Sequence, residues 1–319
     1  MVVNPESFEQ IIGQSVKIKE VVEQAKKFAN LDAPLLIQGE TGTGKDLFAK
    51  SCHHFGSRRM QKFIAVNCAG LPAEEAESEM FGHRGNGAES VGFFEYAHGG
   101  TVLLDSISEL SLEMQAKLLR FLNDGSFRRV GEDQEIQVNV RVICTSLQPL
   151  SLLVEQGKVR EDLFHRLNVL TLNLPPLRDR KEDIPLLVDY FIAQISNQLG
   201  VSKLEYDNVF LQALQNYHWR GNLRELYNAL YRACTLSHSY RLAVKDLHLP
   251  RDMEAMIEVR EEATLEEMMS QYEAQLLHQF YAEYPSTRKL AQRLGLSHTA
   301  VANKLRQYGL TKNGNSKDE

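Results

Sequence analysis

The feature that most limits the folds open to this chain is the segment 39–46, Gly-Glu-Thr-Gly-Thr-Gly-Lys-Asp, which follows the apolar run 34–37. A glycine-rich loop between a strand and a helix closes its backbone N–H groups around phosphates, and its lysine reaches the β- and γ-phosphates. A helix signal is present over 46–55, and it stops at Gly56. The sequence therefore predicts a nucleoside triphosphate site made of Gly39, Glu40, Thr41, Gly42, Thr43, Gly44, Lys45 and Asp46.

Length and composition limit the class of protein. At 319 residues the chain exceeds the roughly 250–300 residues at which a single core stops growing, so we expect more than one domain. No apolar run reaches the ~18 residues of a membrane span, and the N-terminus lacks the features of a signal peptide. The four cysteines are far apart, which argues against a disulfide framework or a zinc site. We expect a cytoplasmic protein without a membrane partner.

The first half of the chain alternates strand-like and helix-like segments, which predicts an α/β fold with a mostly parallel sheet and helices on both faces. After Pro175-Pro176 the pattern becomes helical over 184–199, 209–217 and 223–237, which indicates a helical lid beside the nucleotide. The expected strands are 35–38, 63–67, 101–105, 140–145 and 169–174, with a helix over 110–122 between them.

A second part of the nucleotide site is the segment 99–105, Gly-Gly-Thr-Val-Leu-Leu-Asp. An apolar strand that ends in aspartate, about sixty residues after a phosphate loop, is typical of the residue that holds Mg²⁺ directly or through water. Asp105 is therefore the predicted metal ligand, with Mg²⁺ arriving together with ATP.

The order of the motifs resembles that of the bacterial enhancer-binding proteins, a branch of the AAA+ ATPases that regulate transcription. The similar segments are 11–15, 63–69, 160–169, 175–184 and 219–226. The resemblance implies a AAA+ domain with an adenine-side motif at 11–15 and a nucleotide-state switch at Asn67. It also implies that Arg160 and Arg166 reach the γ-phosphate of a neighbouring subunit, whereas Arg224 acts within its own subunit.

The chain departs from that family at three places. Ser106 stands where members carry the glutamate that orients the attacking water, and a serine hydroxyl is no comparable base at neutral pH. Leu147 stands where a polar sensor, usually asparagine, is expected. Residues 84–91 are shorter than the loop that contacts the sigma factor σ54, and they lack its Phe-Thr. We expect slow or absent hydrolysis and no remodelling of σ54 polymerase.

The C-terminal part differs from the rest in charge and pattern. From Ser286 onward seven basic and two acidic residues give a net charge of +5, so the preceding part carries −11 of the total of −6. The sequence predicts helices over 272–281, 287–294 and 298–308, the last two capped by Ser286 and Ser297 and separated by Gly295. This pattern is typical of a helix-turn-helix. The expected core is Leu290, Ala291, Leu294, Leu296, Val301 and Leu305.

The last helix supplies the predicted surface that reads double-stranded DNA. Thr299, Asn303 and Arg306 fall on its outer face, and Asn can make a bidentate contact to adenine. An ordinary three-helix packing module is the alternative, and the basic charge favours DNA. The full predicted DNA-binding set is Arg288, Lys289, Ser297, His298, Thr299, Ala300, Asn303, Lys304 and Arg306.

Segment 284–309 resembles the DNA-binding end of the aromatic-amino-acid-responsive regulators within the same family. The resemblance implies a repressor of genes for aromatic amino-acid synthesis and transport that responds to ATP and L-tyrosine and works with σ70 RNA polymerase. It further implies a palindromic operator and a homodimer, with a hexamer in the presence of tyrosine and ATP. Longer members begin with a regulatory ACT/PAS region, which we expect to be missing because the nucleotide domain starts almost at Met1.

The predicted domains are the AAA+ α/β subdomain 1–178, the lid 179–248, a linker 249–264 and the helix-turn-helix domain 265–319. Two other functions stay open at this point. One is a working ATPase that activates σ54 promoters, and the other is a weak phosphohydrolase that uses the bound metal.

Overall fold

The computed structural model describes residues 7–72, 74–85, 88–237, 239–249, 264 and 286–309, together with residues 269–270, 273–274, 276–277, 280–281 and 284. The chain divides into two compact units, Met1–Leu249 and Pro250–Glu319, and each is described by itself. The predicted linker lies outside the described residues except for its ends, Leu249 and Thr264.

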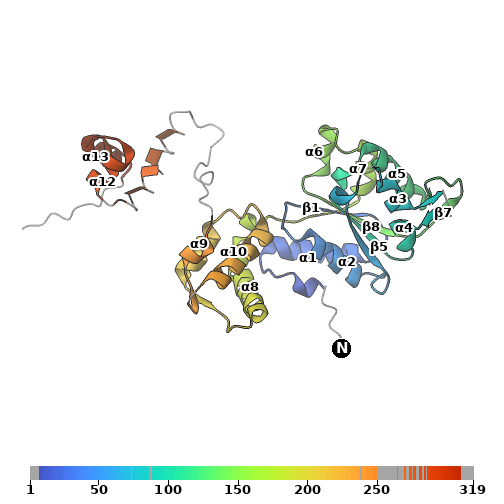
Figure 1. Ribbon diagram of the computed structural model, residues 1–319, viewed down its shortest axis with the longest axis horizontal. Coiled ribbons are helices and arrows are strands. Elements are labelled where there is room, and N and C mark those ends of the chain that lie inside the picture. The colour runs from blue at the N-terminus through green and yellow to red at the C-terminus, as the bar shows by residue number, and fades with distance from the viewer. Residues whose placement is uncertain are drawn as a thin grey trace, which may run out of the picture. The chain divides into compact units, whose positions relative to one another are not determined.

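The first unit is built around a five-stranded parallel sheet with the strand order β2-β5-β8-β1-β9 (Figure 1). This confirms the predicted α/β class and all five expected strands. The short apolar runs form strands because β-branched and leucine side chains can be buried on both faces of a parallel sheet. The strands are β1 (Leu35–Gln38), β2 (Phe63–Asn67), β5 (Thr101–Asp105), β8 (Arg141–Ser146) and β9 (Leu170–Asn173).

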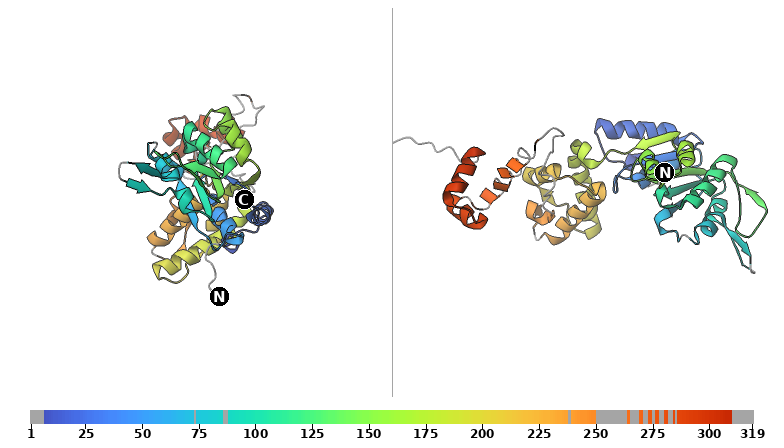
Figure 2. Two further views of the ribbon diagram at one scale, coloured as in Figure 1. Left: turned by 90° about the vertical axis from the view of Figure 1, so that its right-hand side faces the viewer. Right: turned by 90° about the horizontal axis from the view of Figure 1, so that it is seen from above.

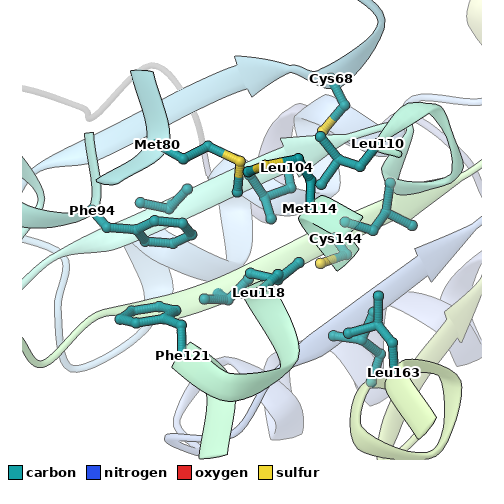
Figure 3. Packing of buried hydrophobic residues seen from close by; sticks show 14 of the residues in the cluster. Cys68, Met80, Phe94, Leu104, Leu110, Met114, Leu118, Phe121, Cys144 and Leu163 are labelled. Carbon is teal, nitrogen blue, oxygen red and sulfur yellow. The ribbon is translucent and has the colours of Figure 1, made fainter. Parts of the chain in front are cut away.

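Alternate residues of the central strands pack into two separate cores. Leu35 and Ile37 of β1 join the core under α1 and α2, whereas Leu36 points to the core on the opposite face. In the second core, Leu104 and Cys144 from two neighbouring strands lie among Met80, Phe94, Leu118, Phe121 and Leu163 (Figure 3). The period of two along each strand therefore places one layer of helices on each face.

The helices begin and end where capping groups satisfy their free backbone groups. The predicted helix 110–122 is the helix α5, which starts at Leu112 because Ser111 is the N-cap and accepts a hydrogen bond from Met114 N–H. It ends at Asp124 because Gly125 takes a left-handed conformation. The helices of this part are α1 (Val16–Ala29), α2 (Lys45–Phe55), α3 (Ala76–Phe81), α4 (Phe93–Tyr96), α5 (Leu112–Asp124), α6 (Leu150–Glu155) and α7 (Glu161–Leu167).

Two short antiparallel hairpins project from the α/β part. The first joins β3 (His83–Gly85) to β4 (Ala88–Ser90), and the second joins β6 (Ser126–Arg128) to β7 (Glu135–Gln137). The first hairpin occupies the segment in which the sequence lacks the longer loop of the enhancer-binding proteins.

The predicted lid is a group of helices beside the sheet, coloured yellow to orange in Figures 1 and 2. It consists of α8 (Ile184–Leu199), α9 (Asn208–Asn216) and α10 (Asn222–Leu236), with a small pairing of β10 (Glu205–Tyr206) and β11 (Arg241–Leu242). The bounds of α8 agree with the prediction. The helix α9 starts one residue earlier than predicted because Asp207 caps it through Phe210 N–H.

The described part of the second unit contains α12 (Thr287–Leu294) and α13 (His298–Gln307). Gly295 has a φ of 67° at the turn between them, and the Ser297 hydroxyl accepts a hydrogen bond from Ala300 N–H. The Ser286 hydroxyl makes no such capping bond. The earlier predicted helix 272–281 is described only in part.

The core of this unit is close to the predicted one. Leu290, Ala291, Val301 and Leu305 are buried, and Leu294 is partly buried against them. The prediction of Leu296 as a core residue is wrong, because it is 42% exposed. It lies in the turn between Gly295 and α13, outside the contact between the two helices. Among the described residues, no helix is long and apolar enough to cross a membrane.

Candidate functional site

The phosphate loop lies between β1 and α2, as predicted. Gly42 and Gly44 have φ values of 77° and 102°, which only glycine adopts without strain. The Lys45 ammonium donates to the carbonyl oxygens of Gly39 at 2.7 Å and Glu40 at 2.9 Å. The lysine side chain is therefore folded back over its own loop, where a phosphate group would meet it.

A cavity of about 430 Å³ opens in front of this loop. It brings together the predicted residues from four separate segments, which supports a common site. Gly39, Glu40 and Thr43 are not among its lining residues. The lining residues are Thr41, Gly42, Gly44, Lys45, Asp46, Asn67, Ala69, Asp105, Ser106, Leu147, Leu223 and Arg224.

The charges in the cavity influence one another. Burial lowers the pKa of Lys45, and the Asp105 carboxylate opposes that shift. Burial raises the pKa of Asp46, and the nearby Asp105 carboxylate raises it further. Mg²⁺ in nucleotide sites uses one or two carboxylates, with waters and phosphate oxygens completing its shell. The Asp46 and Asp105 carboxylates therefore fit Mg²⁺ brought in by a nucleotide.

The carboxylate of Asp105 is held by a residue that the sequence motifs do not include. The Thr145 hydroxyl at the end of β8 donates to Asp105 Oδ1 at 2.5 Å and accepts from Ser106 N–H at 2.9 Å. Ser106 has a φ of 61°, an uncommon value for a residue other than glycine, and such residues cluster at functional sites. A threonine among the apolar residues of a buried strand was the available signal.

The part of the cavity where the attacking water would be activated, around positions 106 and 147, is less polar than the part around Lys45. Leu147, which follows β8, lines the cavity and is 46% exposed. The lining carboxylates are Asp46 and Asp105, and position 106 offers a hydroxyl group. A hydroxyl with an ordinary pKa cannot accept a proton from water near pH 7. The geometry is thus compatible with phosphate and metal binding and lacks a base for hydrolysis at this position.

The lid is bonded directly to the phosphate loop. Arg178, in the segment that leads into the lid, makes a bidentate ion pair with Glu40 at 2.6 and 2.7 Å, and it lowers the pKa of that carboxyl group. Asn222, at a φ of 52°, donates to the Thr41 carbonyl at 2.9 Å, and Leu223 N–H donates to the Gly42 carbonyl at 2.9 Å. The Glu40 carboxylate also accepts from the Asn222 amide at 3.2 Å, so it joins the phosphate loop both to the lid and to the segment before it.

The predicted adenine-side segment 11–15 is also fixed to the lid. The backbone N–H groups of Gln14 and Ser15 donate to Asp183 Oδ1 at 2.6 and 2.7 Å. Ile12 packs against the apolar core of the lid. The segment therefore lies between the two subdomains, where an adenine-binding role remains a prediction.

The second unit presents the predicted reading face to solvent. Thr299, Asn303 and Arg306 are exposed on α13, together with His298. Arg288 and Lys289 are exposed on α12, while Ala300 is half-buried and Ser297 is used as the helix cap. All the residues of the predicted DNA-binding set therefore lie on α12, on α13 or at the cap of α13.

Lys304 differs from the other residues of the predicted set. Its ammonium donates to Glu273 Oε1 at 2.5 Å, and Tyr308 Oη donates to Glu273 Oε2 at 2.7 Å. The Glu273 carboxylate therefore joins the helical segment around 273–274 to α13. The charge of Lys304 is therefore paired within the unit and is less available to a partner.

Three family models match successive parts of the chain. Residues 11–173 match the sigma-54 interaction domain, residues 178–265 the AAA+ ATPase lid domain, and residues 262–311 a helix-turn-helix domain. The chain is 62% identical to the HTH-type transcriptional regulatory protein TyrR of Haemophilus influenzae, over 97% of this chain and 98% of that protein. The chain belongs to the TyrR family. It is accordingly a DNA-binding transcriptional regulator.

Other TyrR proteins are longer. The TyrR of Salmonella typhimurium is 54% identical over 96% of this chain, which spans 60% of that protein's length. Among solved structures, NtrX of Brucella abortus in complex with ATP has a TM-score of 0.71 at 31% identity, covering 94% of this chain and 69% of NtrX. The AAA+ fold, the lid and the helix-turn-helix of this TyrR-family chain therefore agree with the resemblance.

Two predicted residues lie away from the cavity. Arg160 forms a bidentate ion pair with Asp162, at 2.7 and 3.0 Å, next to the start of α7. Arg166 donates to the Leu122 carbonyl at 2.6 Å and lines a different cavity of about 500 Å³ near the amino ends of the strands. The role of both residues toward a neighbouring subunit stays a prediction for this TyrR-family member.

The short hairpin of this TyrR-family chain is held by an arginine. Arg129 donates to Glu95 at 2.8 and 3.1 Å and also to Glu89 on β4. Backbone bonds join Val130 to Gly82 and to Arg84 at 2.9 Å. The β3–β4 hairpin is therefore fastened to the segment after β6.

Proposed function

We propose that this chain is a repressor that binds double-stranded DNA through α13 and uses ATP with Mg²⁺ as a structural co-effector. The observation that supports this most strongly is the contrast within one cavity. Lys45, Asp46 and Asp105 line this cavity, and they support the proposal as a phosphate-binding lysine and two carboxylates of the kind that hold Mg²⁺. Position 106 carries serine where a water-activating carboxylate would be needed.

Mg²⁺ would neutralise phosphate charge and fix the triphosphate against the loop. Lys45 would then exchange its two carbonyl partners for phosphate oxygens, a contact between opposite charges. Losing a catalytic acid or base lowers a rate by ~10²–10⁴-fold, so a bound ATP would persist. The nucleotide would act as a lasting ligand.

We further propose that bound nucleotide promotes assembly from a homodimer towards a hexamer, with Arg160 and Arg166 reaching the nucleotide of the next subunit. L-tyrosine is the proposed second co-effector, and the targets are palindromic operators of aromatic amino-acid genes transcribed by σ70 RNA polymerase in the cytoplasm. Membership of the TyrR family supports these assignments.

Nucleotide turnover tests the first proposal. Purified chain should bind ATP with Mg²⁺ and hydrolyse it at a rate ~10²–10⁴-fold below ordinary AAA+ ATPases, and Ser106→Glu should raise that rate. Turnover at ordinary AAA+ rates, unchanged in Ser106→Ala, would contradict it. That result would favour the working ATPase that activates σ54 promoters, a function that the matched sigma-54 interaction domain keeps open.

DNA binding tests the second proposal. Gel shifts on a palindromic operator, with and without ATP and L-tyrosine, should show tighter binding when both are present, and sedimentation should show larger assemblies. Calorimetry that finds no tyrosine binding in the presence of ATP would remove tyrosine from the proposal. A phosphohydrolase would instead release phosphate without any effect of DNA.

A further inference from the structure

Thr145 lies at the carboxyl end of β8, a strand that is buried along its whole length. Its side chain is fully buried, at 0% exposed. The neighbouring strand β5 runs parallel, with Leu104 opposite Cys144, so Asp105 and Thr145 follow side by side at the same edge of the sheet. The register places a hydroxyl group beside the predicted metal ligand.

The hydroxyl group has one proton to donate, and its direction is fixed by its partners. Ser106 N–H occupies a lone pair of the oxygen at 2.9 Å, since a backbone N–H can only donate. The proton is then directed to Asp105 Oδ1 at 2.5 Å. This bond orients the Asp105 carboxylate within the cavity that Asp105 lines.

The same hydroxyl group also supports the backbone that follows Asp105. Ser106 adopts φ and ψ values of 61° and 61°, a left-handed conformation that costs energy in residues other than glycine. The bond from its N–H to Thr145 compensates for part of that cost. One side chain therefore controls both the ligand carboxylate and the turn behind it.

We propose that Thr145 is a positioning residue for the metal-nucleotide complex, which it serves by orienting Asp105. The inference rests on the proposed function, in which the cavity holds ATP with Mg²⁺. Groups that orient a metal ligand typically change metal affinity ~10–100-fold when they are removed. Thr145 therefore affects the metal without touching it.

The test uses the full chain and a nonhydrolysable ATP analogue. The affinity for the analogue is measured with EDTA, and Mg²⁺ is then titrated into the complex. Thr145→Val removes the hydroxyl group and keeps the shape of the side chain, while Thr145→Ser keeps the hydroxyl group. Thr145→Ala is measured in parallel, because a buried polar position can tolerate one apolar replacement better than another.

The expected result is a ~10–100-fold loss of Mg²⁺ affinity in Thr145→Val and Thr145→Ala. Affinity for the metal-free analogue should be unchanged, and Thr145→Ser should bind Mg²⁺ as the unaltered chain does. In an Asp105→Asn background, Thr145→Val should have no further effect on Mg²⁺ affinity.

The failures of the two proposals give different results. If the unaltered chain does not bind the analogue, the proposed function fails. If it binds the analogue with Mg²⁺ and Thr145→Val leaves the Mg²⁺ affinity intact, the assignment of Thr145 alone is overturned. If only Thr145→Ser folds, the hydroxyl serves the stability of the strand end, and the assignment is again overturned.

Discussion

The two candidate sites of this chain differ in how their polar side chains are used. In the nucleotide cavity, Lys45 and Asp105 are already bonded to other parts of the chain, to loop carbonyls and to Thr145. On α13, the exposed Thr299, Asn303 and Arg306 have no side-chain partner within the part of the unit that the structure describes. A ligand of fixed shape favours groups held in advance, whereas a base sequence is read by side chains free to bond to base edges.

The largest expected effect comes from removing Lys45, the lysine of the phosphate loop. Lys45→Ala should weaken ATP binding on the order of 100-fold, because a partly buried charge pair with phosphate is lost. Equilibrium binding of a fluorescent ATP analogue measures it, and Lys19→Ala, an exposed lysine on α1, is the matched control. Operator binding without nucleotide should be unchanged. Equal losses in both lysine variants would mean that general charge, and not the loop, binds the nucleotide.

The next largest effect concerns the reading face. Asn303→Ala should cost about 1–3 kcal/mol of operator binding and relax the preference at one base pair, because a bidentate contact to adenine is lost. Competition gel shifts with single-base operator variants measure both quantities. Gln212→Ala, which removes an exposed amide from the lid helix α9, should change neither. An unaltered base preference in Asn303→Ala would place the reading face elsewhere.

Acid should destabilise the first unit more than the second. Burial lowers the pKa of His53 to about 4 from the ordinary 6.5, and this histidine is 1% exposed with Nδ1 at 2.9 Å from Thr101 Oγ1. The unfolded chain therefore takes up the proton first, so stability is complete above pH 6.5 and falls as the pH drops towards 4. The loss amounts to about 3 kcal/mol for the first unit.

Thermal unfolding followed between pH 7 and pH 4 checks this expectation. The first unit should lose stability, and His53→Gln should remove this part of the loss. In the described part of the second unit the histidine His298 is exposed, so that unit should be less affected. If the stability of His53→Gln falls with pH as much as that of the unaltered chain, groups other than His53 cause the loss.

The smallest expected effect distinguishes the roles of Arg306 and Lys304, two basic residues of α13. Arg306→Gln should reduce the slope of log affinity against log salt by ~0.9, because one phosphate contact is lost. Lys304→Gln should leave that slope unchanged, since Lys304 is bonded to Glu273, and Glu273→Gln, which releases the lysine, should not reduce it. A reduced slope in Lys304→Gln would show that the lysine leaves Glu273 to reach DNA.

Most of the fold was predictable because it depends on local patterns. The five strands, α8 and α12 follow from apolar runs and end signals within a few residues, and the phosphate loop has its own motif. The contacts of Thr145, Arg178 and Asn222 were not predictable in the same way. They depend on strand register and on lid placement, which join residues far apart in the sequence. The prediction that Leu296 is a core residue failed because the apolar pattern continues across a turn that reverses the chain.

The bonds between Asn222 and the phosphate loop have a consequence for the synthesis of the chain. The loop at 39–46 leaves the ribosome long before residues 222–224. Leu223 and Arg224 line the cavity, and Asn222 and Leu223 bond to the carbonyl groups of Thr41 and Gly42. A methyl group on Gly42 would lie 2.2 Å from the Gly221 carbonyl oxygen, so the two segments meet without spare room. The growing chain therefore carries a phosphate loop without its lid side, and the nucleotide pocket is finished only when the start of α10 has emerged.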